Sequence, residues 1–288
     1  MKENKSAFQN VHRFLKREIL FCEISPLCFA LSEKKGNLKR HISDFFSKEV
    51  FANRKSDDLL PHSVFSYQSG LIKKGKGIDP ETQYNKAHNI DVACSSIDKL
   101  VIHPGETFSF WRTVGSITEK RGYKKGRVIE GGKLITGVGG GLCNLGNVIH
   151  LLVLHTPLDV TEVHYHSDAL ASDHGRRIPM SSGTSVNYNR IDFRFKNNTE
   201  ADFQLLARVE GETLFAEIRS NDTMKYSYDI SEENHCFRKE GDKYFRVSKI
   251  YRDTISPETG EVVSHDLIRD NHSEVMFDIS EISPELIK

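Results

Sequence analysis

The chain has 288 residues, of which 38% are hydrophobic and 28% charged, and its formal net charge is zero. This composition is that of a folded protein with a substantial core, and it excludes a largely disordered chain. The balanced charge provides no broad basic surface, so we expect no nucleic-acid partner.

The N-terminal sequence predicts a cytoplasmic protein without a signal peptide. Its most apolar stretch, ILFCEISPLCFALS, is interrupted by Glu23 and Pro26, whereas a signal peptide needs an unbroken apolar centre. No run approaches the roughly 18 apolar residues that a membrane span requires. The five cysteines contain no CxxC pair, which disfavours both a disulfide framework and a structural zinc site.

The first half of the chain is predicted to be largely helical. Apolar residues recur at helical spacing in residues 7–21 and again from Leu38 to Phe46. The polar stretch ANRKSDDLLPHS then marks a boundary, so residues 1–60 are assigned to an N-terminal helical segment. A third helix is predicted over residues 83–100, with Cys94 as a small buried residue beside its inward face.

The second half is predicted to be rich in strands. The strand-like TFSFWRTVG precedes a hairpin around Gly131-Gly132, and a helix follows from about Leu142 to Leu154. The stretches DVTEVHYHS and RIDFRFKN alternate as strands do, and hairpins are predicted at residues 203–220 and around KEGDK and SPETGE.

This order of elements predicts an α+β fold. N-terminal helices precede a cysteine-bearing helix packed on a mainly antiparallel β-sheet, and β-hairpins form the C-terminal part. We assign a core domain to residues 61–220 and a C-terminal β-hairpin extension to residues 221–288.

Cys143 lies in the stretch ITGVGGGLCNLGNVIH, directly after a glycine run. A free cysteine is most often a small buried residue. Two features favour a functional role instead. Glycines allow unusual dihedrals and close approach to a ligand, and the first turn of a helix stabilises a thiolate and supplies N–H donors for an oxyanion. The stretch matches neither a phosphate loop, a dinucleotide fingerprint nor a nucleophile elbow.

A cysteine nucleophile needs a general base. If TEVHYHS is a strand, Glu162, His164 and His166 share one face, and Val163 and Tyr165 share the other. The apolar pair suits the core, which places both histidines on an exposed or cleft face.

Asp192, between Ile191 and Phe193, is the candidate to orient the imidazole, and a solvent-facing acid is the alternative reading. A metal site is a further alternative because histidines and aspartates gather here, but they lack metal-site spacing, so we predict no metal and no cofactor. The residues considered are His150, His155, His164, His166, Asp168, Asp173 and His174.

At these residues the sequence resembles the VanW family. The family's glycine run, cysteine and apolar helix correspond to GVGGGLCNLGN, and its two following segments correspond to TEVHYHS and IDFRFKNNT. GETFSFWRTVG and RGYKKGRVIEGG match upstream, and the tail resembles that of stand-alone members. The resemblance implies a link to glycopeptide resistance and cell-wall metabolism.

The resemblance also implies a chemistry. Exported multidomain members imply an L,D-transpeptidase-like cysteine acyltransferase, in which Cys143 accepts the acyl group and His164 and His166 are the family's histidine pair. The sequence departs from the family pattern at Asn144, commonly a glutamine, and at Gly146-Asn147, commonly a Ser/Thr-rich pair.

We therefore expect Cys143 to attack a peptidoglycan stem peptide or precursor, His166 or His164 to move the proton, and Asp192 to orient the histidine. The alternative is a non-catalytic accessory protein of the envelope stress response that binds a peptide or partner. The oligomeric state is not predicted. The expected substrate contacts are Gly139, Gly140, Gly141, Asn144, Asn147 and Ser167.

Overall fold

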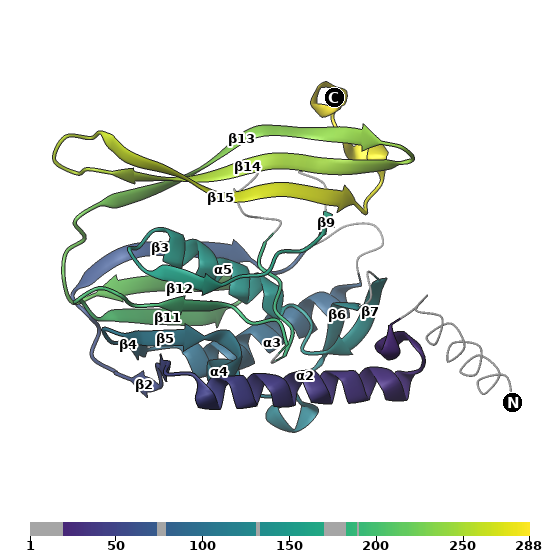
Figure 1. The fold of residues 1–288 in the computed structure, drawn as a ribbon, viewed down its shortest axis with the longest axis horizontal. Coiled ribbons are helices and arrows are strands. Elements are labelled where there is room, and N and C mark those ends of the chain that lie inside the picture. Colours follow the sequence, from purple (N-terminus) through teal and green to yellow (C-terminus); the bar gives the residue numbers. More distant parts are fainter. Residues whose placement is uncertain (1–19, 74–78, 131–132, 170–182, 189) are drawn as a thin grey trace, which may run out of the picture. The chain divides into compact units, whose positions relative to one another are not determined.

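The computed structural model describes residues 20–73, 79–130, 133–169, 183–188 and 190–288 (Figure 1). These residues form two compact units. One comprises residues up to Glu49 together with Asn187–Ile191, and the other comprises Val50–Val186 with Asp192–Lys288. The boundaries expected at residues 60 and 220 stay predictions.

The first unit is built on helix α2 (Pro26–Phe46), which follows the short 3₁₀ helix η1 (Phe21–Glu23). Ser25 caps α2 by accepting a hydrogen bond from the Cys28 N–H at 3.2 Å, and proline occupies the first turn, where its missing N–H costs nothing. The amphipathic helix expected around Leu38–Phe46 is thus confirmed. The helix expected over residues 7–21 falls almost wholly outside the described residues.

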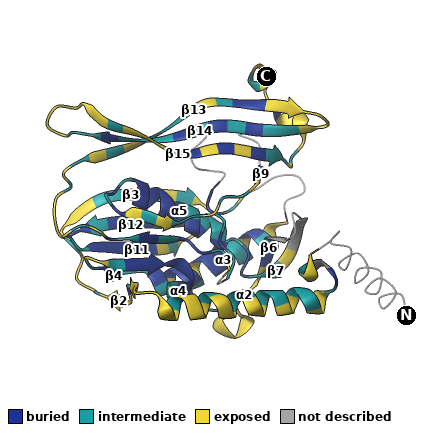
Figure 2. Ribbon diagram, viewed as in Figure 1, coloured by how far each residue is buried: buried dark blue, intermediate teal, exposed yellow. Residues whose placement is uncertain are grey.

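The second unit contains a five-stranded sheet with two helices packed on it. Helix α3 (Pro80–Ile97) contacts β11, and helix α5 (Leu142–Leu154) contacts β12 and β3. Both predicted helices are confirmed, but α3 ends at Ile97, and Leu100, which was expected in this helix, begins strand β4. Figure 2 shows their buried residues in dark blue against buried central strands. The strand order is β2 (Arg54–Lys55), β4 (Leu100–Ile102), β11 (Phe203–Glu210), β12 (Thr213–Ser220) and β3 (His62–Gly70).

A second sheet of four short strands runs beside this core. It differs from the sequence prediction in two places. TFSFWRTVG leaves the strand at Ser109, whose hydroxyl caps the short helix α4 (Phe110–Val114), and DVTEVHYHS ends its regular pairing at Glu162. Local capping thus overrides the β-rich pattern at Ser109. The order is β1 (Val50–Phe51), β5 (Glu106–Ser109), β10 (Arg194–Lys196) and β8 (Asp159–Glu162).

The C-terminal strands form a third sheet, and the hairpins expected at KEGDK and SPETGE are confirmed. Its edge strand β9 (Asp168–Ala169) comes from the segment after the paired histidines and lies parallel to β15. The predicted hairpin around Gly131-Gly132 is formed by β6 (Lys125–Glu130) and β7 (Lys133–Val138). The other strands of the third sheet are β13 (Ser227–Glu240), β14 (Lys243–Ile255) and β15 (Val262–Val275). The short 3₁₀ helices are η2 (Glu119–Arg121), η3 (Ile279–Glu281) and η4 (Pro284–Leu286).

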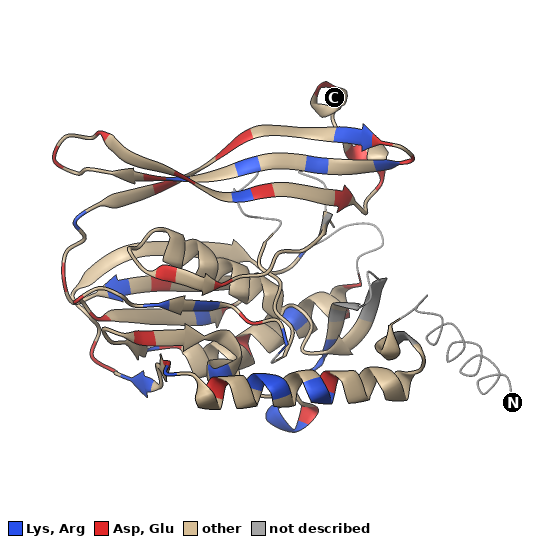
Figure 3. Cartoon of the chain, in the orientation of Figure 1, with Lys and Arg blue, Asp and Glu red and all other residues tan. Residues whose placement is uncertain are grey.

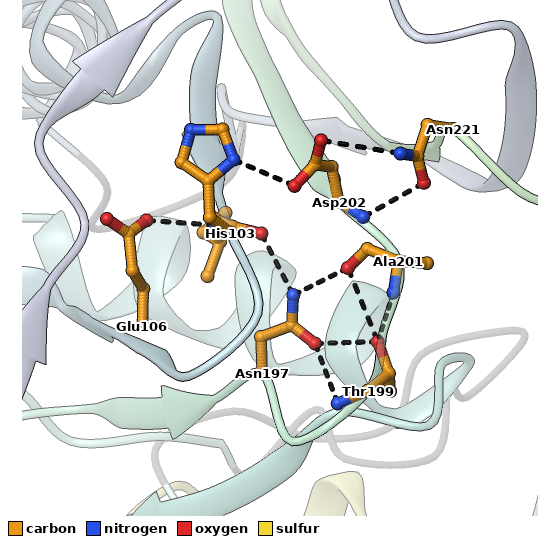
Figure 4. A network of polar contacts seen from close by, with 8 residues as sticks. His103, Glu106, Asn197, Thr199, Ala201, Asp202 and Asn221 are labelled. Atoms are coloured by element: carbon orange, nitrogen blue, oxygen red, sulfur yellow. Dashed lines mark hydrogen bonds and ion pairs between the residues drawn. The ribbon is translucent and has the colours of Figure 1, made fainter.

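These elements confirm the α+β class. The IDFRFKNNT stretch ends in a turn built around Asn197, which is fully buried (Figure 4). Its amide donates to the carbonyls of Ile102 and Ala201 at 3.0 and 2.8 Å, and its oxygen accepts from Thr199. Beside it, His103 Nδ1 lies 2.7 Å from Asp202 Oδ1. This part of the stretch therefore serves the fold, since it joins β4, β10 and β11.

Two glycines with nearly the same φ value differ in how closely other atoms pack against them, and one of them lies just before α5. Gly139 and Gly105 have φ values of +82° and +81°. A Cβ at Gly139 would collide with Ile117 Cγ2, whereas one at Gly105 would meet no atom within 4 Å.

We predict that Gly105→Ala costs about 1–2 kcal/mol of unfolding free energy, from the positive φ alone. Gly139→Ala should cost about 1–3 kcal/mol more, because of the overlap with Ile117. Urea denaturation of both variants measures the difference, and equal losses would contradict the packing described here.

Candidate functional site

The glycine run before α5 is packed against the chain itself. Gly141 caps the helix with φ +104°, and a Cβ there would collide with Lys86 Cγ of α3. Asn89 of the same helix donates to the Gly140 carbonyl at 3.0 Å, and both Gly139 and Gly140 are buried. We expected these glycines to admit a ligand, but the contacts show that they let α3 and Ile117 approach the start of α5.

Cys143 lies in the first turn of α5, as predicted. The residue is partly exposed, and its thiol donates to the Val186 carbonyl at 3.5 Å. Burial raises the pKa of this thiol, and backbone hydrogen bonds from Val186 and Cys143 itself oppose the rise without cancelling it. Loss of solvent thus outweighs the helix terminus and favours the neutral thiol, and a thiolate at Cys143 stays a prediction.

The segment Gly183–Val186 covers the face of α5 that carries Cys143. The Thr184 N–H donates to Asn147 Oδ1 at 3.4 Å, and the Thr184 hydroxyl lies 3.0 Å from His150 Nδ1. A Cβ at Gly146 would lie 3.3 Å from a Val186 methyl. Positions 143, 146, 147 and 150 share one helix face, so this face is occupied by the segment.

The other edge of the segment binds the histidine stretch. The Ser185 N–H donates to the His164 carbonyl at 2.7 Å, the His166 N–H donates to the Gly183 carbonyl at 3.3 Å, and Tyr165 pairs with Thr184. The Tyr165 ring lies 6.1 Å from the His150 ring, on the α5 side. Alternation then places the imidazoles of His164 and His166 on the opposite side.

The side chains of His164 and Glu162 lie on the same side of the chain, as expected. His164 is exposed, and its Nε2 lies 3.1 Å from Glu162 Oε1. Arg194 Nε lies 3.6 Å from the second oxygen of Glu162. Among the described residues, the thiol of Cys143 has the Val186 carbonyl as its hydrogen-bond partner, and it makes no hydrogen bond to either histidine.

Asp192 is buried, and it contacts Glu162, the partner of His164. Its oxygens accept from the Ser109 hydroxyl at 2.6 Å, the Trp111 N–H at 3.1 Å and Arg194 Nε at 2.7 Å. Its own N–H donates to Glu162 Oε1 at 3.3 Å. The carboxylate that contacts a histidine here is that of Glu162. Asp192 holds α4, β10 and Glu162 together, and its role as orienting acid stays a prediction.

The C-terminal sheet reaches the histidine stretch through Arg269. This buried guanidinium donates to the His166 carbonyl at 3.2 Å and lies over the Tyr165 ring, 4.3 Å from its centroid. The Glu274 N–H donates to the Ser167 carbonyl at 2.9 Å. No sequence pattern points to Arg269, because it lies about a hundred residues from the stretch that it holds.

The other predicted substrate contacts, Asn144, Asn147 and Ser167, differ from one another in burial and in hydrogen bonding. The side-chain oxygen of Asn144 is buried without a hydrogen-bond donor among the described residues, whereas that of Asn147 accepts from Thr184. The side chain of Ser167 is exposed. Within the described residues, no group of three or more His, Cys, Asp or Glu side chains could hold a metal. His174 and Asp173 lie outside them.

Two adjoining cavities lie elsewhere in the second unit. One, of about 480 Å³, is lined in part by His155 and Phe65, whose rings stack at 3.6 Å. The other, of about 460 Å³, is lined in part by Pro157 and Phe203. Both share the stretch from Asp222 to Tyr228 that enters the C-terminal sheet. In the part of the chain that the structure describes, no helix is long and apolar enough to cross a membrane.

His150 gives the site a pH-dependent stability. It is 1% exposed, and burial together with the positive charge of Arg269 lowers its pKa from 6.5 to about 3. The folded chain therefore favours neutral His150, so stability is fully present above pH ~6.5 and is lost as the pH falls towards 3.

We predict that the chain loses about 2 kcal/mol between pH 7 and pH 5 through His150 alone. His150→Gln keeps a hydrogen-bonding group for Thr184 but removes the titration. Urea denaturation at both pH values should show a smaller acid-dependent loss in this variant. The same loss in both chains would contradict a neutral, buried His150.

Comparisons with known proteins match the region that contains this candidate site. Residues 85–219 match the family model described as VanW like protein. The chain is 26% identical over 231 residues to the Vancomycin B-type resistance protein VanW of Enterococcus faecalis (strain ATCC 700802 / V583), which covers 80% of this chain and 84% of that protein.

The chain is also 29% identical over 140 residues to the uncharacterized protein YoaR of Bacillus subtilis (strain 168), across 49% of this chain and 45% of that protein. No solved structure matches the chain. The family match extends from within α3 to within β12, so it includes Cys143, the histidine stretch and Asp192. Over these residues the chain is similar to the VanW family.

Proposed function

We propose that this chain acts in cell-wall metabolism linked to glycopeptide resistance, as a cysteine acyltransferase on peptidoglycan stem peptides or their precursors. The relative from Enterococcus faecalis carries vancomycin resistance in its name, which supports the biological setting. The chemistry rests on Cys143 and its immediate surroundings.

The observation that carries the proposal is the buried oxygen of the Asn144 side chain. It lies next to Cys143 in sequence, at the start of α5, and no donor among the described residues satisfies it. An unsatisfied buried acceptor costs about 1–3 kcal/mol. A peptide N–H bound beside Cys143 would supply the missing donor, which favours a substrate with an amide backbone.

The proposed step is an acyl transfer in two parts. The sulfur of Cys143 forms a bond to the substrate carbonyl, and the C–N bond to the leaving residue breaks. An imidazole takes the thiol proton and passes it to the leaving amine. An acceptor amine or water then attacks the thioester and releases the thiol. N–H groups at the start of α5 are the proposed oxyanion donors.

The described structure corresponds to a resting state in this scheme. The Val186 carbonyl holds the thiol proton, and the segment Gly183–Val186 separates the thiol from the imidazoles. Substrate binding must therefore displace this carbonyl before a histidine can take the proton. The Glu162 carboxylate makes His164 the better oriented base, while His166 is held through its backbone.

A second candidate is a non-catalytic protein that binds a peptide or partner. The protonated, covered thiol favours it, and so do the two adjoining cavities lined by residues between Asp222 and Tyr228. In that case the chain would bind stem peptides without forming a covalent adduct, and Cys143 would be dispensable.

Mass spectrometry of the chain incubated with a synthetic stem peptide separates the two candidates. We predict a thioester adduct on Cys143 that hydroxylamine removes, and no thioester with Cys143→Ser. Cys22→Ser serves as the matched control, since Cys22 is also a partly exposed cysteine but lies in the other unit. An adduct of unchanged yield in Cys143→Ser would refute the assignment, and peptide binding without any adduct would favour the second candidate.

The base can be identified in the same assay. We predict that His164→Asn slows adduct formation by about 10²–10⁴-fold if it is the base. His166→Asn should then have a smaller effect, because it is the His164 imidazole that contacts the Glu162 carboxylate. A larger loss in His166→Asn would transfer the role to that residue.

A further inference from the structure

Helix α2 carries an apolar stripe that is exposed in the described part of the chain. At about 100° per residue, the five large apolar residues of this stripe fall within an arc of roughly 60°. Their exposed fractions range from 49% to 82%. Figure 2 shows α2 without a buried residue, and none is found in it. The stripe comprises Leu27, Leu31, Leu38, Ile42 and Phe45.

The opposite side of α2 is the side that packs within the unit. A Cβ at Gly36 would lie 3.7 Å from the Arg190 side chain, and Arg40 donates to the Arg190 carbonyl at 3.3 Å. Gly36 and Arg40 lie about 150° or more from the centre of the stripe. The small and polar side of the helix thus faces Arg190, and the apolar stripe lies on the opposite, exposed side of the described helix.

Helix α2 carries both basic and acidic residues along its length (Figure 3), and the two kinds lie at different angles around its axis. Lys34, Lys35 and Lys39 are exposed and lie within about 90° of the centre of the stripe. The two acidic residues, Glu33 and Asp44, are less exposed and lie at least about 130° away from it. An apolar stripe bordered by lysines, with acids on the far side, is the pattern of a helix that lies in an anionic lipid interface.

We propose that α2 binds the surface of an anionic lipid bilayer. The stripe enters the boundary between headgroups and acyl chains, and the lysine stems extend along the apolar surface so that their ammonium groups reach the lipid phosphates. This mode of binding lies on the bilayer and does not span it. The proposal is independent of the acyl transfer, because it uses no residue of the Cys143 site.

Vesicle co-sedimentation of the full chain tests the proposal. We expect binding to vesicles of phosphatidylcholine with phosphatidylglycerol, and much weaker binding to phosphatidylcholine alone. Leu38→Asp and Phe45→Asp should each weaken binding at least tenfold. Lys34→Gln, Lys35→Gln and Lys39→Gln should each weaken it about fivefold at low salt.

The matched control is Val263→Asp, which replaces an apolar residue of similar exposure, 55%, on β15. It should leave vesicle binding unchanged. Circular dichroism and thermal melts check that each variant stays folded.

Three results would overturn the proposal. One is wild-type chain that does not sediment with anionic vesicles. Another is equal loss of binding in Val263→Asp and Leu38→Asp. The third is a dimeric mass by light scattering that Leu38→Asp abolishes while vesicle binding is absent, which would assign the stripe to a second copy of the chain.

Discussion

The candidate site depends on one short piece of backbone pairing, between Gly183–Ser185 and His164–His166. The side chains of α5 lie on one face of this paired backbone, and the imidazoles lie on the other. The Val186 carbonyl, which follows the pairing, accepts a hydrogen bond from the thiol of Cys143. The pairing links the face of the helix to the histidine stretch. The same pairing keeps them apart, because it places peptide backbone between the sulfur and the imidazoles.

Several buried polar contacts make this arrangement rigid. Asp192 accepts hydrogen bonds from three elements, and removing one partner of such a buried ionic contact typically costs about 3–5 kcal/mol. Arg269 adds a tie from the C-terminal sheet, which lies beyond the residues that match the family model. The histidine stretch is therefore held by the core on one side and by the C-terminal sheet on the other.

Much of the fold could be predicted from the sequence, because its signals are local. Helical spacing identified α5, and turn residues identified the hairpins at β6–β7, β11–β12, β13–β14 and β14–β15. Alternation correctly paired Glu162 with His164 on one face. The early end of the strand at Ser109 was missed, because a side-chain cap competes with β propensity there.

The site itself was less predictable, because its decisive contacts are distant in sequence. Cys143 was located, but the carbonyl that covers it belongs to Val186, and the guanidinium that fixes His166 belongs to Arg269. The glycine run before Cys143 predicts a ligand-binding loop. In the structure, the side chains of Lys86 and Ile117 fill the space beside these glycines. A run of glycines indicates that other atoms pack closely against the backbone. It does not indicate whether those atoms belong to a ligand or to the chain itself.

In the resting chain, the Cys143 thiol donates to the Val186 carbonyl, and burial raises its pKa. The most direct test of this state of the thiol is the rate of iodoacetamide alkylation of Cys143 as a function of pH, in a chain with Cys22 and Cys28 replaced by serine. Cys94 and Cys236 are buried, and peptide mapping identifies the modified residue. We predict that the rate rises only above the ordinary thiol pKa of about 8.5. A rate that is already at its plateau near pH 7 would contradict this prediction.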